Sequence, residues 1–219
     1  MIDSYIMAQR IKDTYQKYLW VFIAFNIVLF WAILIEGFFS IEFANDKFSI
    51  FFDAKSILFI LSPIISLILS GLLSNPIKEF LVFWRVRDRL PGCRAFTCLI
   101  NKDTRIDRSK LQRLAGAFPD DPAEQNRLWY KLYKGCEDDK IVIGSHRDFL
   151  LTRDLCSISF LFIIILLPIS LLFFQNSSLK ISYSLFLVLQ YLVLSIASRN
   201  FGNRFACNVL AITSNNKIS

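Results

Sequence analysis

The sequence has little of what metalloproteins and many enzymes need. Only one of its 219 residues is a histidine, His146, and its five cysteines form no C-x-x-C pair. A structural zinc site takes four such ligands at defined spacing, so no metal site is expected. Glycine-rich phosphate loops, the G-x-S-x-G nucleophile elbow and the H-E-x-x-H motif are absent as well. We therefore expect no enzyme activity, no catalytic residue and no cofactor.

Charge is missing from four long stretches, namely residues 18–35, 56–77, 155–179 and 181–198. A bilayer core of about 30 Å is crossed by about 20 helical residues, so each stretch is long enough to span it with ordinary tilt. Backbone in lipid must satisfy its own hydrogen bonds, which makes each span a helix. None of the four stretches holds an ionisable residue, and this argues against a proton-coupled pump or transporter.

These stretches predict an all-α integral membrane protein with four transmembrane helices in two hairpins. A small helical cytoplasmic domain is inserted between spans 2 and 3. The sequence is predicted to divide into four parts: an N-terminal arm and hairpin over 1–77, the insert over 78–154, a second hairpin over 155–198 and a cytoplasmic tail over 199–219. The spans of the first hairpin are predicted at 18–39 and 56–77, and those of the second at 155–175 and 181–198.

The distribution of basic residues predicts the orientation. The insert carries 16 of the 25 lysines and arginines, whereas the loop over 36–55 has four acidic residues and two lysines. By the positive-inside rule, the insert and both termini face the cytoplasm. The net charge of +7 is then largely explained by sidedness, and we expect no direct binding to genomic DNA. All five cysteines lie on or near the reducing side of the membrane and are expected to be free thiols.

A stripe of serines marks the second predicted span, with one serine at every fourth position. Residues four apart share one face of a helix. One interpretation is close helix packing, which small residues permit. The other is the wall of a water-filled path. Asn26 and Gln190 are polar residues of the first and fourth spans that join the pore-lining or helix-packing candidates. The serines are Ser62, Ser66, Ser70 and Ser74.

Turn and capping signals divide the insert. Residues 77–90 read as a helix along the membrane surface, with a short strand around 85–89 as the alternative. Asp107 is expected to cap a helix that ends near Gly116, and Asp121 one that runs to Lys134 or Gly135. A short helix is expected over 93–101. Ser145 is expected to cap a long helix that continues through the third span, so that the insert is mechanically connected to the membrane.

Basic side chains of the insert form a second set of candidates. They are expected to bind an anionic ligand such as a nucleotide, or a partner protein. The alternative is a solvated surface that simply obeys the positive-inside rule. The candidates are Arg94, Arg105, Arg108, Arg113, Lys131 and Arg147.

Several short phrases of the insert resemble a known group of proteins. They are the segments 90–96 (LPGCRAF), 105–107 (RID), 124–126 (EQN), 128–134 (LWYKLYK), 145–146 (SH) and 149–154 (FLLTRD). They resemble small four-span bacterial membrane proteins of anti-phage operons, of the Hailong or Kiwa kind. The resemblance implies a homo-oligomeric inner-membrane protein. It would be either an ion channel controlled by a nucleic-acid-derived signal from a partner enzyme, or a membrane sensor that recruits a cytosolic DNA-binding partner.

The sequence therefore predicts a multi-pass protein of the bacterial inner membrane that forms a homo-oligomer. We expect a gated pore or ion channel controlled by ligand or partner binding to the insert, in an anti-phage role. The alternative is a membrane sensor or scaffold that recruits a cytosolic partner protein. Expected partners are the lipid bilayer, further copies of the chain, and a cytosolic protein or a nucleotide or oligonucleotide signal.

Overall fold

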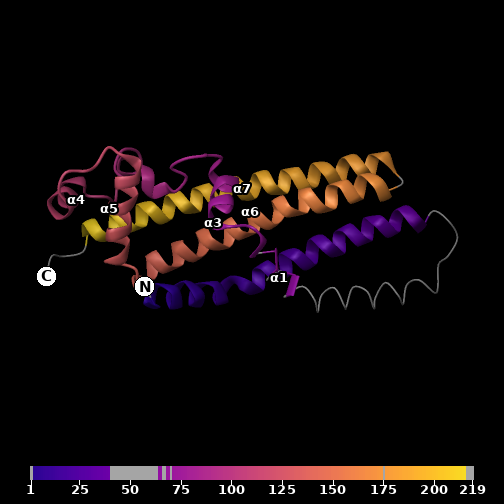
Figure 1. Cartoon of the computed structure of the whole chain (residues 1–219), viewed down its shortest axis with the longest axis horizontal. Coiled ribbons are helices and arrows are strands. Elements are labelled where there is room, and N and C mark those ends of the chain that lie inside the picture. Colours follow the sequence, from indigo (N-terminus) through magenta and orange to yellow (C-terminus); the bar gives the residue numbers. More distant parts are fainter. Residues whose placement is uncertain (1, 40–63, 66–67, 70, 175, 216–219) are drawn as a thin grey trace. The chain divides into compact units, whose positions relative to one another are not determined.

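The computed structural model describes residues 2–39, 64–65, 68–69, 71–174 and 176–215. Within these ranges the chain is all-helical and contains no strand (Figure 1). The longest elements are α1 (Ile2–Phe39), α6 (Lys140–Phe173) and α7 (Ser177–Asn215). The predicted all-α class is confirmed for this part of the chain.

Among the described residues, three helices are long and apolar enough to cross a membrane. Their candidate spans are Asp13–Leu34 in α1, Lys140–Phe173 and Ser177–Asn215. These helices leave large apolar side chains exposed, including Val21 at 63% and Leu172 at 79%. A water-soluble surface rarely carries so many apolar residues in one region, whereas a lipid-facing surface does. The helices are thus compatible with a membrane-embedded protein.

The second predicted span lies mostly outside the described residues. Residues 64–65, 68–69 and 71–72 are described, and all of them are helical. Ile64, Ile68 and Leu72 are exposed at intervals of four, while Leu69 is buried. One face of the described turns is therefore apolar and uncovered, as expected for contact with lipid.

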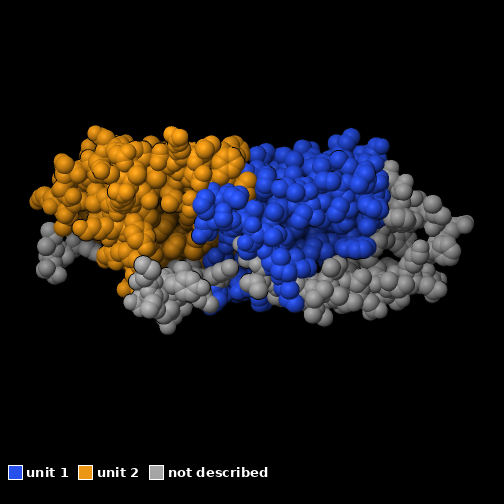
Figure 2. All heavy atoms as spheres, in the orientation of Figure 1, with its two compact units in different colours: residues 1–78, 154–194 blue, residues 79–153, 195–219 orange. Residues whose placement is uncertain are grey.

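The chain divides into two compact units (Figure 2). Unit 1 comprises Met1–Lys78 and Asp154–Leu194, and unit 2 comprises Glu79–Arg153 and Ser195–Ser219. The three divisions fall inside α3, α6 and α7, so each of these helices contributes residues to both units.

Unit 1 is held together by aromatic contacts between its long helices. Phe22 of α1 stacks on Phe162 of α6, with ring centroids 6.1 Å apart. Phe30 of α1 lies 5.6 Å from Phe174 and 5.9 Å from Tyr183 of α7. Such pairs add about 0.5–1.5 kcal/mol each beyond their burial. They connect α1 to both helices that follow the insert.

Unit 2 contains α3 from Glu79 onward, two short 3-10 helices and two α-helices. Their bounds are α3 (Asn75–Phe83), η1 (Pro91–Arg94), η2 (Leu99–Asn101), α4 (Arg108–Ala115) and α5 (Pro122–Lys134). Residues 84–90 are neither helix nor strand, so both predicted forms of that segment are wrong. The single short helix expected over 93–101 is replaced by η1 and η2.

Two predicted helix starts in unit 2 are confirmed. Asp107 caps α4 by accepting a hydrogen bond from the backbone N–H of Lys110 at 3.0 Å. Asp121 caps α5 by accepting from the N–H of Glu124 at 3.0 Å. Gly116 ends α4 with a φ of 79°, a left-handed conformation that a residue without a Cβ adopts readily.

The predicted start of α6 is wrong. The helix begins at Lys140, and Ser145 lies inside it, where its hydroxyl donates to the carbonyl of Val142 at 3.0 Å. Asp139 provides the cap instead, since its Oδ1 accepts from the N–H groups of Ile141 at 2.8 Å and Val142 at 3.3 Å. A carboxylate in that position satisfies two of the free amides of the first turn.

The end of α7 also differs from the prediction. A tail was expected from residue 199, but α7 continues to Asn215 and its residues 205–211 are buried. Two of its side chains bind the last turn of α3. The hydroxyl of Ser195 donates to the carbonyl of Val82 at 3.1 Å, and Nε of Arg199 donates to the same oxygen. A cation at a helix C-terminus is favourable because the terminal carbonyls carry partial negative charge.

Aromatic side chains form the centre of unit 2. Trp129 and Tyr133 of α5 both meet the ring of Phe205 of α7 edge-on. The ring of His146 stacks on Phe205 with centroids 4.7 Å apart, and its Nδ1 lies 3.3 Å from the hydroxyl of Tyr133. Nε1 of Trp129 donates to the carbonyl of Ala206 at 3.3 Å. Trp129 and Tyr133 of α5 therefore belong to the core of the unit, and the histidine is packed against Tyr133.

Candidate functional site

A buried ion pair with a tyrosine lies within unit 1. Nζ of Lys78 lies 3.1 Å from Oδ1 of Asp154, and the hydroxyl of Tyr15 donates to Oδ2 of the same carboxylate at 3.0 Å. The three residues are 6%, 3% and 2% exposed. Three helices, α3, α6 and α1, each contribute one side chain to this cluster.

The three side chains are brought together because each sits beside an apolar stretch. Tyr15 shortly precedes the first charge-free stretch, Lys78 directly follows the second, and Asp154 directly precedes the third. Helix packing of the apolar residues takes these polar ends out of water with them. A buried charge is tolerated when it is paired and hydrogen-bonded, and here both carboxylate oxygens have donors.

Removing one partner of such a cluster strongly lowers the stability of the fold. An isolated buried charge is strongly unfavourable, so losing one partner of a buried ion pair costs about 3–5 kcal/mol. Tyr15, Lys78 and Asp154 therefore act as one electrostatic unit rather than as three independent contacts. Buried ionisable groups with specific charge partners are candidates for functional sites. We take this cluster as the candidate functional site.

The pore or packing candidates are only partly described. Ser62, Ser66 and Ser70 lie outside the described residues. Ser74 is exposed directly before α3, and its carbonyl accepts from the N–H groups of Ile77 and Lys78 at 3.0 Å each. The choice between a packed stripe and a water-filled path stays open.

Asn26 and Gln190 behave differently from each other. Asn26 is fully buried, and its Nδ2 donates to the carbonyl of Phe22 in its own helix at 2.9 Å. Its Oδ1 has no hydrogen-bond partner among the described residues. Gln190 of α7 accepts a hydrogen bond from Ser159 of α6 at 3.4 Å, and so joins two helices.

Two of the basic candidates of the insert are engaged in local contacts. Nη2 of Arg105 donates to Oδ2 of Asp103 at 2.6 Å and to Oδ1 of Asn208 at 2.8 Å. Nη2 of Arg147 donates to Oδ1 of its neighbour Asp148 at 3.0 Å. Arg105 thereby fixes the loop before α4 to the last turns of α7, a structural role that leaves less of its guanidinium for a ligand.

The other four basic candidates lie on separate elements. Arg94, at the end of η1, is half-buried, and its guanidinium lies 5.9 Å from the ring centroid of Phe83. Arg108 and Arg113 are exposed on α4, and Lys131 is exposed on α5. None of the six candidates lines the pocket of unit 2 described next.

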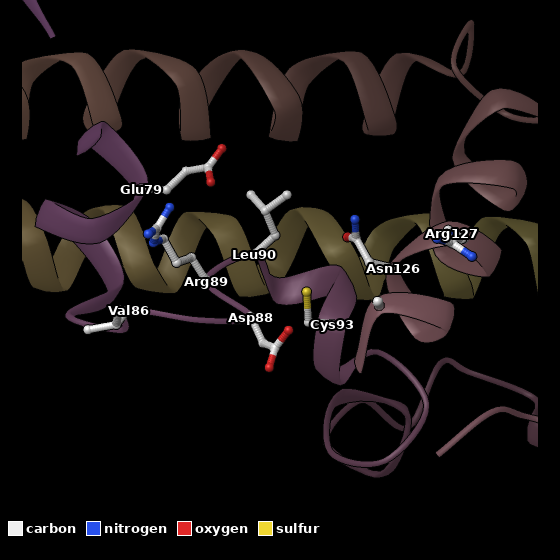
Figure 3. A pocket seen from close by; sticks show the side chains of 9 residues that line it. Glu79, Val86, Asp88, Arg89, Leu90, Cys93, Asn126 and Arg127 are labelled. Atoms are coloured by element: carbon white, nitrogen blue, oxygen red, sulfur yellow. The ribbon is translucent and has the colours of Figure 1, made fainter. Parts of the chain in front are cut away.

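Unit 2 holds an open pocket of about 340 Å³ between the segment 79–93 and α5 (Figure 3). Its lining includes two acidic and two basic residues, together with Asn126, Cys93 and apolar side chains. Burial raises the pKa of the Cys93 thiol, and the nearby carboxylate of Asp88 adds to this effect. A thiol with a raised pKa is a poor nucleophile, so Cys93 is a wall residue rather than a reactive one. The charged lining residues are Glu79, Asp88, Arg89 and Arg127.

Sequence reasoning missed the buried cluster. Lys78 and Asp154 look like the first polar residues outside a span, and Tyr15 looks like part of a membrane-boundary group. The signal in the sequence is their position relative to the membrane. All three lie next to ends of charge-free stretches, and the predicted topology places these ends at the same membrane surface. The pairing of Lys78 with Asp154 across 76 residues becomes visible only in the fold.

Comparisons of the chain with protein-family models, with curated proteins and with solved structures find no match.

Proposed function

We propose that the chain is a homo-oligomeric, multi-pass protein of the bacterial inner membrane that acts as a gated pore or ion channel. In this proposal four helices cross the bilayer, and the insert and both termini face the cytoplasm. Binding of a ligand or partner to the insert controls opening. The observation that carries the proposal is the buried Tyr15–Lys78–Asp154 cluster.

The cluster supports the proposed sidedness. Tyr15 lies before the first stretch, Lys78 after the second and Asp154 before the third. If the first two stretches form a hairpin and the insert does not cross the bilayer, these three ends lie at the same membrane surface. Their contacts at 3.0 and 3.1 Å fit that arrangement.

The cluster also supplies a contact that can hold a closed state. Separation of α1, α3 and α6 would break it, at a cost of about 3–5 kcal/mol if one charge stays buried. Moving a two-state equilibrium from 1:99 to 99:1 takes about 5.5 kcal/mol, so an interaction of this size is enough to favour one arrangement strongly. A ligand that binds the open arrangement more tightly would then shift the population.

Ion flux into proteoliposomes tests the proposal. We expect low flux for the wild type and at least tenfold higher flux for Asp154→Ala or Lys78→Ala. The charge-swapped double variant, Lys78→Asp with Asp154→Lys, should return flux towards the wild-type level because the pair is restored. Asp148→Ala is the matched control, since it removes a carboxylate from an exposed pair.

Flux is interpreted only for variants that stay monodisperse in detergent. If wild type and all variants reconstitute yet conduct no more than protein-free vesicles, the pore proposal is wrong. The sensor or scaffold hypothesis would be favoured instead if the same preparations retained a stoichiometric cytosolic partner. The anti-phage role depends on the sequence resemblance alone and stays a prediction, which phage plating on cells with and without the gene would test.

A further inference from the structure

We propose that the pocket of unit 2 binds a small zwitterion that carries a primary ammonium and an anionic group, of the phosphoethanolamine type. The pocket is lined by Glu79, Asp88, Arg89 and Arg127, and its volume of about 340 Å³ lies within the range of ligand sites. This inference goes beyond the proposed gating and does not depend on conductance.

The four charged side chains of the pocket are not paired with one another. The ion pairs among the described residues of unit 2 involve Asp103, Asp107, Glu137 and Asp148, and none includes a charged residue of the pocket lining. The pocket thus presents both signs of charge, and although Arg89 acts electrostatically on Glu79, no ion pair joins them. A ligand with only one charge would leave two lining groups of the same sign beside it, whereas a zwitterion complements both.

The charged and polar side chains are spread along the length of the pocket. Glu79 and Arg89 lie at one end of the pocket, Cys93 and Asn126 lie further along, and the side chain of Arg127 extends away from the others (Figure 3). Nε of Arg89 donates to the carbonyl of Arg85 at 3.0 Å, which fixes the arm and leaves its two terminal nitrogens for an anion. We therefore assign the anionic group chiefly to Arg89.

The acceptors favour a ligand with N–H groups. Glu79 is half-buried, and its carboxyl group lines the pocket. Oδ1 of Asn126 is buried with no hydrogen-bond partner among the described residues. A buried acceptor without a partner costs free energy, and a ligand that donates to it removes that cost. A primary ammonium has three such donors, whereas a quaternary ammonium has none.

The backbone that shapes the pocket is strained. Trp84 and Asp88 lie in the segment that joins α3 to η1, and they have φ values of 52° and 50°, in the left-handed region. Asp tolerates this region, but a bulky aromatic residue rarely adopts it. The guanidinium of Arg199 lies 4.0 Å from the ring centroid of Trp84 and holds it in place. Strained backbone is retained mostly where it positions functional groups, here Asp88 and Arg89 at the pocket.

Calorimetric titration of the full-length protein in detergent tests the site. Phosphoethanolamine should bind at least tenfold more tightly than phosphocholine, which has the same anion but no N–H donor. Glu79→Gln and Arg89→Gln should each weaken binding at least tenfold, and Arg127→Gln should have a smaller effect. Lys102→Gln is the control, because Lys102 is an exposed cation of the same unit that does not line the pocket.

Nanodiscs identify the source of the zwitterion. Binding of free phosphoethanolamine supports a soluble ligand. A higher melting temperature in phosphatidylethanolamine than in phosphatidylcholine, lost in Glu79→Gln and Arg89→Gln, supports a lipid headgroup. The inference is overturned if free phosphoethanolamine binds no better than phosphocholine and the two lipids give the same melting temperature. Neither readout requires ion flux, so failure here and failure of the pore proposal are distinguishable.

Discussion

Unit 1 and unit 2 use ion pairs of the same chemistry in opposite surroundings. In unit 1, the side chains of Lys78 and Asp154 are 7% and 3% exposed. In unit 2, those of Arg105 and Asp103 are 55% and 16% exposed, and those of Arg147 and Asp148 are 48% and 35% exposed. The difference shows that the number of ion pairs says little about stability, because solvent determines what each pair contributes.

The energetic consequence follows from the dielectric. Water screens an exposed pair, so its contribution is about 0–1 kcal/mol. A buried pair is weakly screened, and each partner prevents the other from being an isolated charge in an apolar environment. Unit 1 should therefore be sensitive to single charge changes, and unit 2 to changes in packing.

The largest effect is expected for the buried carboxylate. Asp154→Ala leaves Lys78 buried without its carboxylate and should lower the free energy of unfolding by about 3–5 kcal/mol. Thermal unfolding in detergent measures the change. The double variant Lys78→Met with Asp154→Leu should recover most of the loss, since an apolar replacement of both partners is often neutral. If Asp154→Ala were as stable as the wild type, unit 1 would not be more sensitive to single charge changes than unit 2.

A packing change should give the next largest effect, this time in unit 2. A Cβ at Gly92 would lie 2.3 Å from Oδ1 of Asn126 and 3.0 Å from Cε3 of Trp129, whereas one at Gly144 would meet nothing within 4 Å. Overpacking costs about 1–3 kcal/mol, so Gly92→Ala should destabilise by that amount. Gly144→Ala, inside α6, should instead stabilise by about 0.5–1 kcal/mol. Equal effects of the two substitutions would contradict the importance of packing.

Acid should affect two carboxylates of unit 2 in opposite ways. The hydrogen bond from Arg105 lowers the pKa of Asp103, so this group stabilises the fold above its unfolded pKa and the gain is lost as pH falls through the folded pKa. The melting temperature of Asp103→Asn should therefore lie below that of the wild type at pH 7, by the equivalent of about 0.2–1 kcal/mol, and the gap should close towards pH 3.

Glu79 provides the opposite sign. Burial raises its pKa, so the protonated form stabilises the fold below the unfolded pKa, and this contribution is lost as pH rises through the folded pKa. Glu79→Gln keeps the group neutral and should melt at a higher temperature than the wild type at pH 7, but not at pH 4. Both variants should be measured over one pH series. If both melt below the wild type at pH 7, or both above it, the opposite pKa shifts of Asp103 and Glu79 are wrong.

The smallest effect is expected for an exposed pair. Arg147→Ala removes the hydrogen bonds to Asp148 at 3.0 and 3.2 Å. Because both side chains are exposed and adjacent in sequence, the free energy of unfolding should change by no more than about 0.5 kcal/mol. Chemical denaturation measures it. A loss comparable to that of Asp154→Ala would show that exposure does not separate the two kinds of pair.

Local signals in the sequence predicted local structure well. Asp107 and Asp121 were identified as caps from residue type and spacing, because a cap depends on a few neighbouring residues. Ser145 carries the same kind of signal but lies inside α6, since Asp139 six residues earlier caps first and Gly144 did not interrupt the helix. A capping pattern therefore shows where a helix can begin and not where it does.

Contacts across long separations were not predictable. The pairing of Lys78 with Asp154 depends on how apolar helices pack, and nothing near either residue encodes it. The continuation of α7 past Ser198 was missed because the polar residues there indicate a tail. In the fold, Asn208 binds Arg105, and the carbonyl of Ala206 accepts from Trp129. Their partners lie 103 and 77 residues away.

The path of α7 has a consequence for synthesis of the protein. The centre of unit 2 needs Phe205, and the end of α3 needs Arg199, although most of the unit is encoded before residue 154. The ribosome therefore completes the insert long before it makes the residues that close it. Until then the partner faces of Trp129 and Tyr133 stay uncovered, and folding of unit 2 must wait until α7 has been synthesised. Chaperone protection during that interval, and sensitivity to tags fused close to residue 215, follow from the order in which the chain emerges.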